Sequence, residues 1–184
     1  MNGPFQITQC PTSHVLPTEL EALRPEPLLL PGESREQYDA LQGIVLGDIA
    51  PRSAIEWLLA FDVAELSWEI RRYRSLRHKL LEAFRHRAVE IALSQIDLVG
   101  IADHAKDVAK GHIAENVLDW RVNTTAAAEI DRRLSEYGVD QQSISMEVYV
   151  QVREQHAFFD GLINSASLHR LNLLREITRG RFAK

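Results

Sequence analysis

Residues 53–94 read SAIEWLLAFDVAELSWEIRRYRSLRHKLLEAFRHRAVEIALS. Neither proline nor glycine interrupts these roughly 40 residues, and apolar side chains return at steps of three and four, as on one face of an α-helix. Ser53 and Glu56 have the spacing of a capping box, so the helix should begin there. The recurring apolar positions are Ile55, Leu59, Val63, Leu66, Ile70, Tyr73, Leu76, Leu80, Phe84, Ala88 and Ile91.

The length of this helix predicts the shape of the molecule. At ~1.5 Å per residue it would extend ~60 Å. A compact globule of the same chain length would be only ~40 Å across. We therefore expect an elongated helical bundle.

The segment before this helix has a different character. Six of the seven prolines lie between Pro4 and Pro31, a density that leaves no room for a long helix. We expect an extended, Pro-rich N-terminal arm over residues 1–31 and a helical bundle domain over residues 32–184. A short helix over 34–47 should open the bundle, with Ser34 and Gln37 as a second capping box.

Further helical patterns follow the long helix. Apolar steps predict helices over 101–120, 124–137 and 143–180, with Asn123 or Thr124 as a cap and Gly138 after a helix end. No segment alternates with period two, as a half-buried strand would. The predicted fold class is all-α, with two long helices as its main elements.

Charge predicts how the two long helices pair. Acidic residues open the first of them (Glu56, Asp62, Glu65, Glu69), and arginines close the second (Arg170, Arg175, Arg179). Each exposed ion pair contributes only ~0.2–1 kcal/mol, but several of one sign can select between similar packings. We expect antiparallel pairing, with residues 55–66 close to residues 166–179.

Composition places the chain among soluble globular proteins. Its 184 residues are 45% hydrophobic and carry a net charge of −5. No run of 18 apolar residues and no signal-peptide pattern occurs, so we expect a cytoplasmic protein without a membrane partner. Cys10 is the only cysteine, which leaves an internal disulfide impossible and a thiol or zinc function without support.

The strongest candidate site is a basic cluster within the long helix. Residues 71–87 contain seven cations and one acid, Glu82. Such a cluster can neutralise phosphates without reading sequence, or it can be used in ion pairs within the protein or between subunits. The candidate phosphate-binding or partner-binding residues are Arg71, Arg72, Arg74, Arg77, Lys79, Arg85 and Arg87.

Two sets of residues have the spacing of metal ligands. His78, Glu82 and His86 share one helical face, but the surrounding cations disfavour a divalent ion, so we expect exposed histidines flanking an ion-paired glutamate. His104, Asp107 and His112 are the second set, in which His112 falls on the apolar stripe and should be a core or boundary histidine. No metal site is predicted.

Catalysis finds no support in the sequence. Asp62, Glu65 and Glu69 resemble paired acids, yet general acid–base chemistry needs a desolvated cleft, and a solvated helix face is the expected setting. The sequence lacks a Gly-rich phosphate loop, a nucleophile elbow and a nucleotide fingerprint. We predict no catalytic residue, no cofactor and no enzyme activity.

Four stretches resemble a family of uncharacterised helical proteins of alpha-proteobacteria. They are LLLPGESREQYDAL, the WEIRRY centre of the long helix, EIDRRLSEYGVD and INSASLHRLNLLREITRGR, and the resemblance extends over residues 28–182. The resemblance implies a helical fold and a bacterial origin. Members of that family often begin with a basic Gly/Arg/Lys-rich segment, whereas this chain begins with an acidic, Pro-rich one.

The sequence therefore favours a non-catalytic helical interaction or scaffold protein. Its long amphipathic helices should pair with each other and with a second copy or another helical partner. The alternative is a nucleic-acid-associated protein that uses the basic cluster over Arg71 to Arg87.

Overall fold

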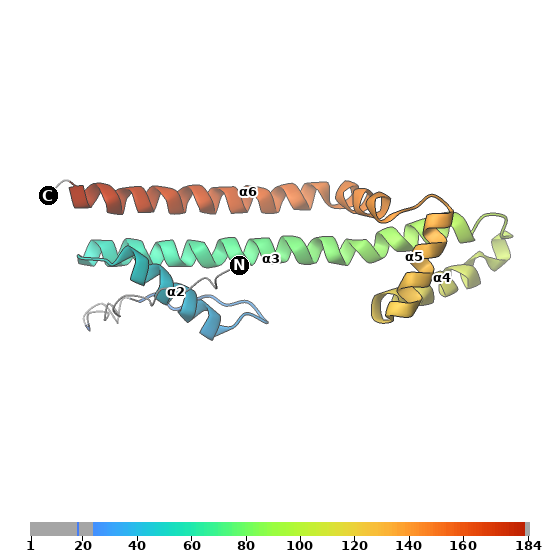
Figure 1. Cartoon of the computed structure of the whole chain (residues 1–184), viewed down its shortest axis with the longest axis horizontal. Coiled ribbons are helices and arrows are strands. Elements are labelled where there is room, and N and C mark those ends of the chain that lie inside the picture. Colours follow the sequence, from blue (N-terminus) through green and yellow to red (C-terminus); the bar gives the residue numbers. More distant parts are fainter. Residues whose placement is uncertain (1–17, 19–23, 183–184) are drawn as a thin grey trace, which may run out of the picture. The chain divides into compact units, whose positions relative to one another are not determined.

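A computed structural model describes Thr18 and residues 24–182 of the chain (Figure 1). Its elements are α2 (Arg35–Ile49), α3 (Ala54–Asp97), the 3-10 turn η1 (Asp103–Ala105), α4 (Lys106–Val122), α5 (Thr124–Glu136) and α6 (Gln141–Phe182). These described residues contain no strand, so the predicted all-α fold class is confirmed. Most of the predicted arm, residues 1–17 and 19–23, lies outside the described part of the chain.

Several helix ends have the local side-chain chemistry that the sequence predicted. Ser53 Oγ accepts a hydrogen bond from the Glu56 backbone N–H at 3.3 Å, and Ser34 Oγ accepts one from Gln37 at 3.2 Å. Asn123 caps α5 in the same way. Gly138, with φ +79°, follows α5 in the left-handed conformation that closes many helices. Each of these signals depends only on residues close in sequence.

The chain divides into two compact units. The first contains Met1–Tyr73 and Gly161–Lys184, and the second contains Arg74–Asp160. The first unit thus holds α2, the first half of α3 and the second half of α6. The second holds the remainder of α3 and α6 together with α4 and α5.

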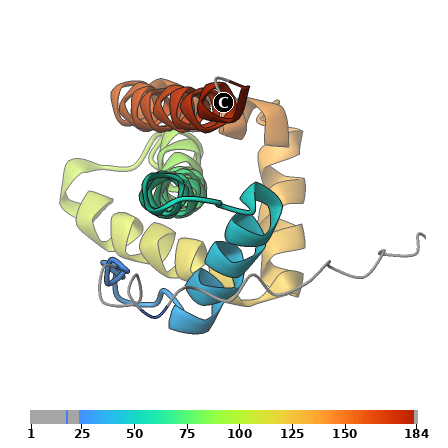
Figure 2. The same ribbon diagram turned by 90° about the vertical axis from the view of Figure 1, so that its left-hand side faces the viewer.

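In the first unit, α3 packs on α2 and on α6 (Figure 2). Ala60 and Val63 of α3 share an apolar cluster with Ile177 of α6. A second cluster joins Ile70 of α3 to Ile163 of α6. Because earlier residues of α3 meet later residues of α6, the two helices run antiparallel in this unit, and residues 55–66 lie near residues 166–179 as predicted.

The buried side of α3 in this unit is wider than one stripe. Trp57, Phe61 and Trp68 are buried, and Trp68 meets Tyr38 of α2 edge-on at 5.6 Å between ring centroids. Ile55, which the apolar periodicity placed on the core stripe, is instead 71% exposed. That prediction was wrong because α3 contacts two helices here, which shifts its buried face toward α2.

The second unit has a core made by four helices. It joins Val89 and Leu93 of α3 to residues of α4, α5 and α6. Helices α4 and α5 lie against each other (Figure 1), and Trp120 Nε1 of α4 donates a hydrogen bond to Asp131 Oδ1 of α5 at 2.9 Å. The remaining core residues are Ala88, Ala92, Ile113, Val117, Ile130, Leu134, Ile144, Val148 and Val152.

A search of the described helices for a segment both long enough and apolar enough to span a membrane finds none.

Candidate functional site

The seven cations of the predicted basic cluster do not act as one group. Arg71 and Arg72 belong to the first unit, whereas Arg74, Arg77, Lys79, Arg85 and Arg87 belong to the second. Each side chain must therefore be considered with its own neighbours.

Arg72 is engaged within the first unit by Glu33. Arg72 Nε lies 2.7 Å from Glu33 Oε1, and Nη2 lies 2.8 Å from Oε2, a bidentate pair in which both side chains are largely buried. The hydrogen bond from Arg72 lowers the pKa of the Glu33 carboxyl from 4.5 to about 2, against the opposing effect of burial. Trp68 Nε1 also donates to Glu33, so this arginine holds the segment before α2 against α3.

Arg71 and Arg77 also have partners within their own units. Arg71 donates to Gln37 Oε1 at 2.9 Å and lies over the Trp68 ring at 5.3 Å. Arg77 forms an ion pair with Asp160 of α6. Three of the seven cations thus contribute to packing inside the protein.

Four cations of the cluster have no carboxylate partner among the described residues: Arg74, Lys79, Arg85 and Arg87. Arg74 and Arg87 are exposed on α3, and Arg87 lines a shallow hollow with Glu90 and Ser94. Lys79 and Arg85 line a different pocket, which residues of α4 also line.

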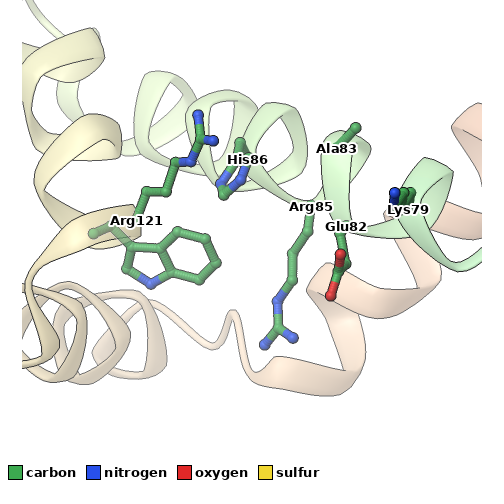
Figure 3. A pocket seen from close by; sticks show the side chains of 7 residues that line it. Lys79, Glu82, Ala83, Arg85, His86 and Arg121 are labelled. Carbon is green, nitrogen blue, oxygen red and sulfur yellow. The ribbon is translucent and has the colours of Figure 1, made fainter. Parts of the chain in front are cut away.

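This pocket lies between α3 and α4 and has a volume of about 680 Å³. Figure 3 shows Arg85 and His86 projecting from α3 and Arg121 projecting from α4. Three cations and a single carboxylate surround it. The lining residues are Lys79, Glu82, Ala83, Arg85, His86, Trp120 and Arg121.

The wall of the pocket contains Trp120, whose ring lies close to a cationic side chain. Arg85 lies over the Trp120 ring at 5.6 Å, and His86 meets the same ring edge-on at 5.6 Å. Arg85 also donates to Gln141 of α6, which fixes its direction. Because Asp131 accepts the Trp120 indole N–H, the indole is held in place by the second unit itself.

His86 is the less exposed of the two pocket residues that meet the Trp120 ring. Its Nδ1 is buried and has no hydrogen-bond partner among the described residues. Burial lowers the pKa of His86 from 6.5, and the nearby charges of Arg121 and Arg85 lower it further. The ring is therefore neutral at pH 7.

The structure corrects two expectations for the histidines. His78 is exposed and pairs with Glu82 at 3.1 Å, as predicted, but His86 packs on Trp120 and is not an exposed flank. His112, predicted to be a core or boundary histidine, is 72% exposed beside Glu115. Among the described residues, no three His, Cys, Asp or Glu side chains are placed to hold a metal ion.

A second surface lies in the first unit. Asp62 is exposed and Glu65 and Glu69 are half-buried on α3, beside the exposed Leu58. On α6, Leu168 and Leu171 are 59% and 44% exposed. Leu168 lies on the side of α6 opposite Ile163 and Ile177, the residues that contact α3, and Leu171 follows it at a helical step of three, nearer the edge of that side.

Sequence reasoning found the cations of α3 but missed their neighbours. Trp120 and Arg121 reach the pocket only because α4 folds back on α3, and nothing in the local pattern of residues 101–120 indicates that contact. The exposed leucines of α6 could have been recognised, because they recur at helical spacing opposite the predicted core stripe.

Comparison of the chain with protein-family models, with curated proteins and with solved structures gives no match in any of the three.

Proposed function

We propose that the chain is a non-catalytic interaction protein of the bacterial cytoplasm that associates with a second copy of itself through its first unit. The observation that carries the proposal is the exposure of Leu168 and Leu171 on the face of α6 directed away from α3. Burial of apolar surface is the main driving force of association, and a solvent-exposed pair of leucines on a long helix provides such surface.

Charge complementarity supports a second copy as the occupant. Beyond the leucines, the face of α6 continues with Arg175, which is exposed and has no ion-pair partner among the described residues. The exposed side of α3 has the opposite charge, with Asp62 and Glu65 following Leu58. Each copy thus offers one acidic helix face and one basic helix face.

The order of residues also fits a two-fold pair. On both faces the apolar residues precede the charged ones along the chain. When the apolar residues of the two copies meet and the opposite charges meet, α6 of one copy lies parallel to α3 of the other. Since α3 and α6 are antiparallel in the first unit, the two α3 helices would then be antiparallel to each other. A two-fold axis generates that arrangement and repeats the contact twice.

A charge exchange tests this contact. Asp62→Arg and Arg175→Glu should each weaken association by placing like charges in contact, whereas the double variant should restore it. The self-association constant, measured by sedimentation at about 50 mM salt, should fall by several-fold in each single variant and recover in the double. If the double variant associates no better than the two single variants, the two faces do not meet.

A matched control is available in the second unit. Val108 is an exposed apolar residue of α4, remote in sequence from both faces. Val108→Glu should leave self-association unchanged, whereas Leu168→Glu should weaken it.

A second candidate function is association with nucleic acid. It is favoured by the four cations without carboxylate partners in the described residues, Arg74, Lys79, Arg85 and Arg87. Binding to a non-specific duplex should fall by orders of magnitude between low and physiological salt. Arg74→Glu with Arg87→Glu should abolish the binding, and a lack of binding to duplex at 50 mM salt would remove this candidate.

A further inference from the structure

We infer that the pocket between α3 and α4 is a binding site for a short run of phosphate groups. The inference goes beyond self-association, because it concerns a small ligand and residues of the second unit alone. Three features support the inference: the number of cations that line this pocket, their lack of carboxylate partners among the described residues, and the volume of the pocket.

The cations come from two helices that meet in this unit. Lys79 and Arg85 lie on α3, and Arg121 lies in the last turn of α4 (Figure 3). None of the three forms an ion pair with a carboxylate in the described part of the chain. Like charges held near one another are unfavourable, and an anion bound between them would relieve the repulsion.

The single carboxylate of the pocket does not cancel this charge. Glu82 brings one negative charge against the three positive charges of Lys79, Arg85 and Arg121. The C-terminal end of α4 carries a partial negative charge that disfavours an anion, and Arg121 in that turn offsets it. A net positive field remains at the pocket.

Size and chemistry favour phosphate groups over a single carboxylate. A volume of about 680 Å³ lies within the range of ~300–1,000 Å³ typical of small-molecule sites. Two arginines and a lysine can donate to several oxygens at once, and charge-assisted bonds of this kind suit phosphate. Trp120 and His86 form an apolar, neutral part of the wall, against which a planar ring attached to the phosphates could lie.

One experiment distinguishes the kinds of ligand that could supply these phosphate groups. Inorganic tripolyphosphate, ATP and a short single-stranded oligonucleotide are titrated separately into the full-length chain at about 50 mM salt, with calorimetry giving the affinity. The Trp120 indole N–H signal, assigned with Trp120→Phe, reports whether the pocket is occupied. Saturable binding of tripolyphosphate that shifts this signal is the expected result.

Variants then assign the binding to the pocket. Arg121→Gln and Arg85→Gln should each weaken tripolyphosphate binding by about tenfold, as expected for loss of a charge-assisted bond. Arg153→Gln is the control, because Arg153 is an exposed arginine of α6 in the same unit that does not line the pocket, and it should change the affinity by less than about twofold. Far-UV circular dichroism shows whether each variant is folded.

The outcomes separate clearly. Equal affinities for tripolyphosphate and ATP would identify the phosphate run alone as the recognised group. Tighter binding of ATP would show that the pocket also recognises the attached ring. The inference is wrong if tripolyphosphate shows no saturable binding, if only the oligonucleotide binds, or if Arg153→Gln weakens binding as much as Arg121→Gln. None of these results depends on the oligomeric state of the chain, so failure here leaves the proposed self-association standing.

Discussion

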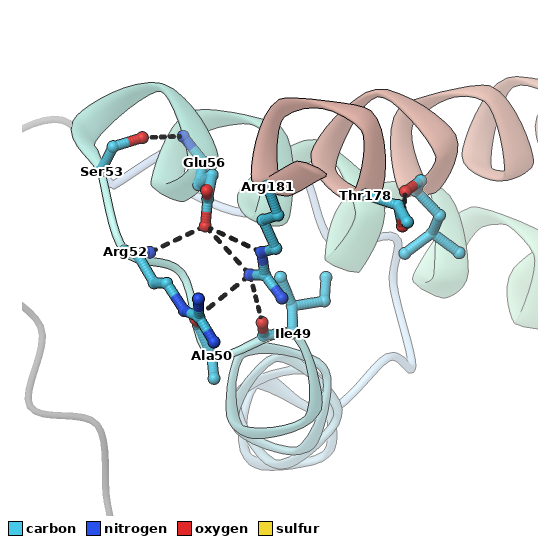
Figure 4. Close-up of polar contacts among 8 residues, drawn as sticks. Ile49, Ala50, Arg52, Ser53, Glu56, Thr178 and Arg181 are labelled. Carbon is cyan, nitrogen blue, oxygen red and sulfur yellow. Dashed lines mark hydrogen bonds and ion pairs between the residues drawn. The ribbon is translucent and has the colours of Figure 1, made fainter. Parts of the chain in front are cut away.

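Arg181 and Glu56 are 125 positions apart in the sequence, yet Arg181 Nη2 lies 2.9 Å from Glu56 Oε2 (Figure 4). The same nitrogen also donates to the backbone oxygens of Ile49, at 2.6 Å, and Ala50, at 3.2 Å. Glu56 in turn accepts from the Arg52 backbone N–H. One arginine near the end of α6 thus joins the end of α2 to the start of α3.

Replacing Arg181 should therefore destabilise the first unit. Arg181→Met keeps most of the side-chain length, but it leaves the largely buried Glu56 carboxylate with only the Arg52 backbone N–H as donor and removes the side-chain donor of two carbonyl oxygens. The expected loss in the free energy of unfolding is about 1–3 kcal/mol, measured by urea denaturation. Arg179→Met is the control, since among the described residues Arg179 pairs only with the exposed Glu176, and should cost less than about 0.5 kcal/mol.

Ala50 offers a stabilising change at the same junction. It has φ 47° and is the only non-glycine residue with positive φ among those the structure describes. An L-residue with a Cβ pays about 1 kcal/mol for this conformation. Ala50→Gly should thus raise the free energy of unfolding by a few tenths of a kcal/mol or more, after the greater flexibility of glycine in the unfolded chain is subtracted. Clear destabilisation by Ala50→Gly would show that Ala50 is not strained.

The Glu33–Arg72 pair predicts a pH dependence. Because the pKa of Glu33 is about 2 in the folded chain, below its ordinary value of 4.5, its contribution to stability is complete above pH 4.5 and is lost as the pH falls toward 2. Glu33→Gln should be less stable than the wild type at pH 7 by up to about 3 kcal/mol. The difference between the two proteins should shrink steadily below pH 4.5, and a constant difference down to pH 2.5 would contradict the pairing.

His86 should titrate below its ordinary pKa of 6.5. Burial is the main cause, Arg121 and Arg85 add to it, and Glu82 acts in the opposite direction. Since the unfolded chain binds the proton more readily, the contribution of His86 to stability is present above pH 6.5 and declines as the pH falls below it. A titration of the imidazole signals by NMR measures the pKa. Arg121→Gln should raise it, and a wild-type value at or above 6.5 would contradict the described environment.

The elements that the sequence predicted well are those controlled by near neighbours. Ser34, Ser53 and Asn123 cap helices because the N–H groups that they bind lie two or three residues away. Asp140 shows the limit of this reasoning. It accepts the Ser143 backbone N–H at 2.7 Å, so α6 begins at Gln141 and not at Ser143.

The contacts that the sequence could not predict join distant segments. Nothing near Arg72 indicates Glu33 as its partner, and nothing near Arg85 indicates Trp120, because tertiary packing decides which side chains meet. Helical periodicity also assumes one buried face, whereas α3 contacts α2 and α6 in the first unit. This explains why Ile55 was wrongly placed in the core and why Trp57 and Trp68 were missed.

Self-association through the first unit is tested most directly by the mass of the protein in solution. Sedimentation equilibrium between about 1 and 100 µM should show the wild type passing from one to two copies as concentration rises, as mass action requires. Leu168→Glu with Leu171→Glu should remain at the mass of one copy over that range while keeping its helical circular dichroism. A wild type that stays at the mass of one copy throughout, or a double variant that pairs as well as the wild type, would contradict the proposed function.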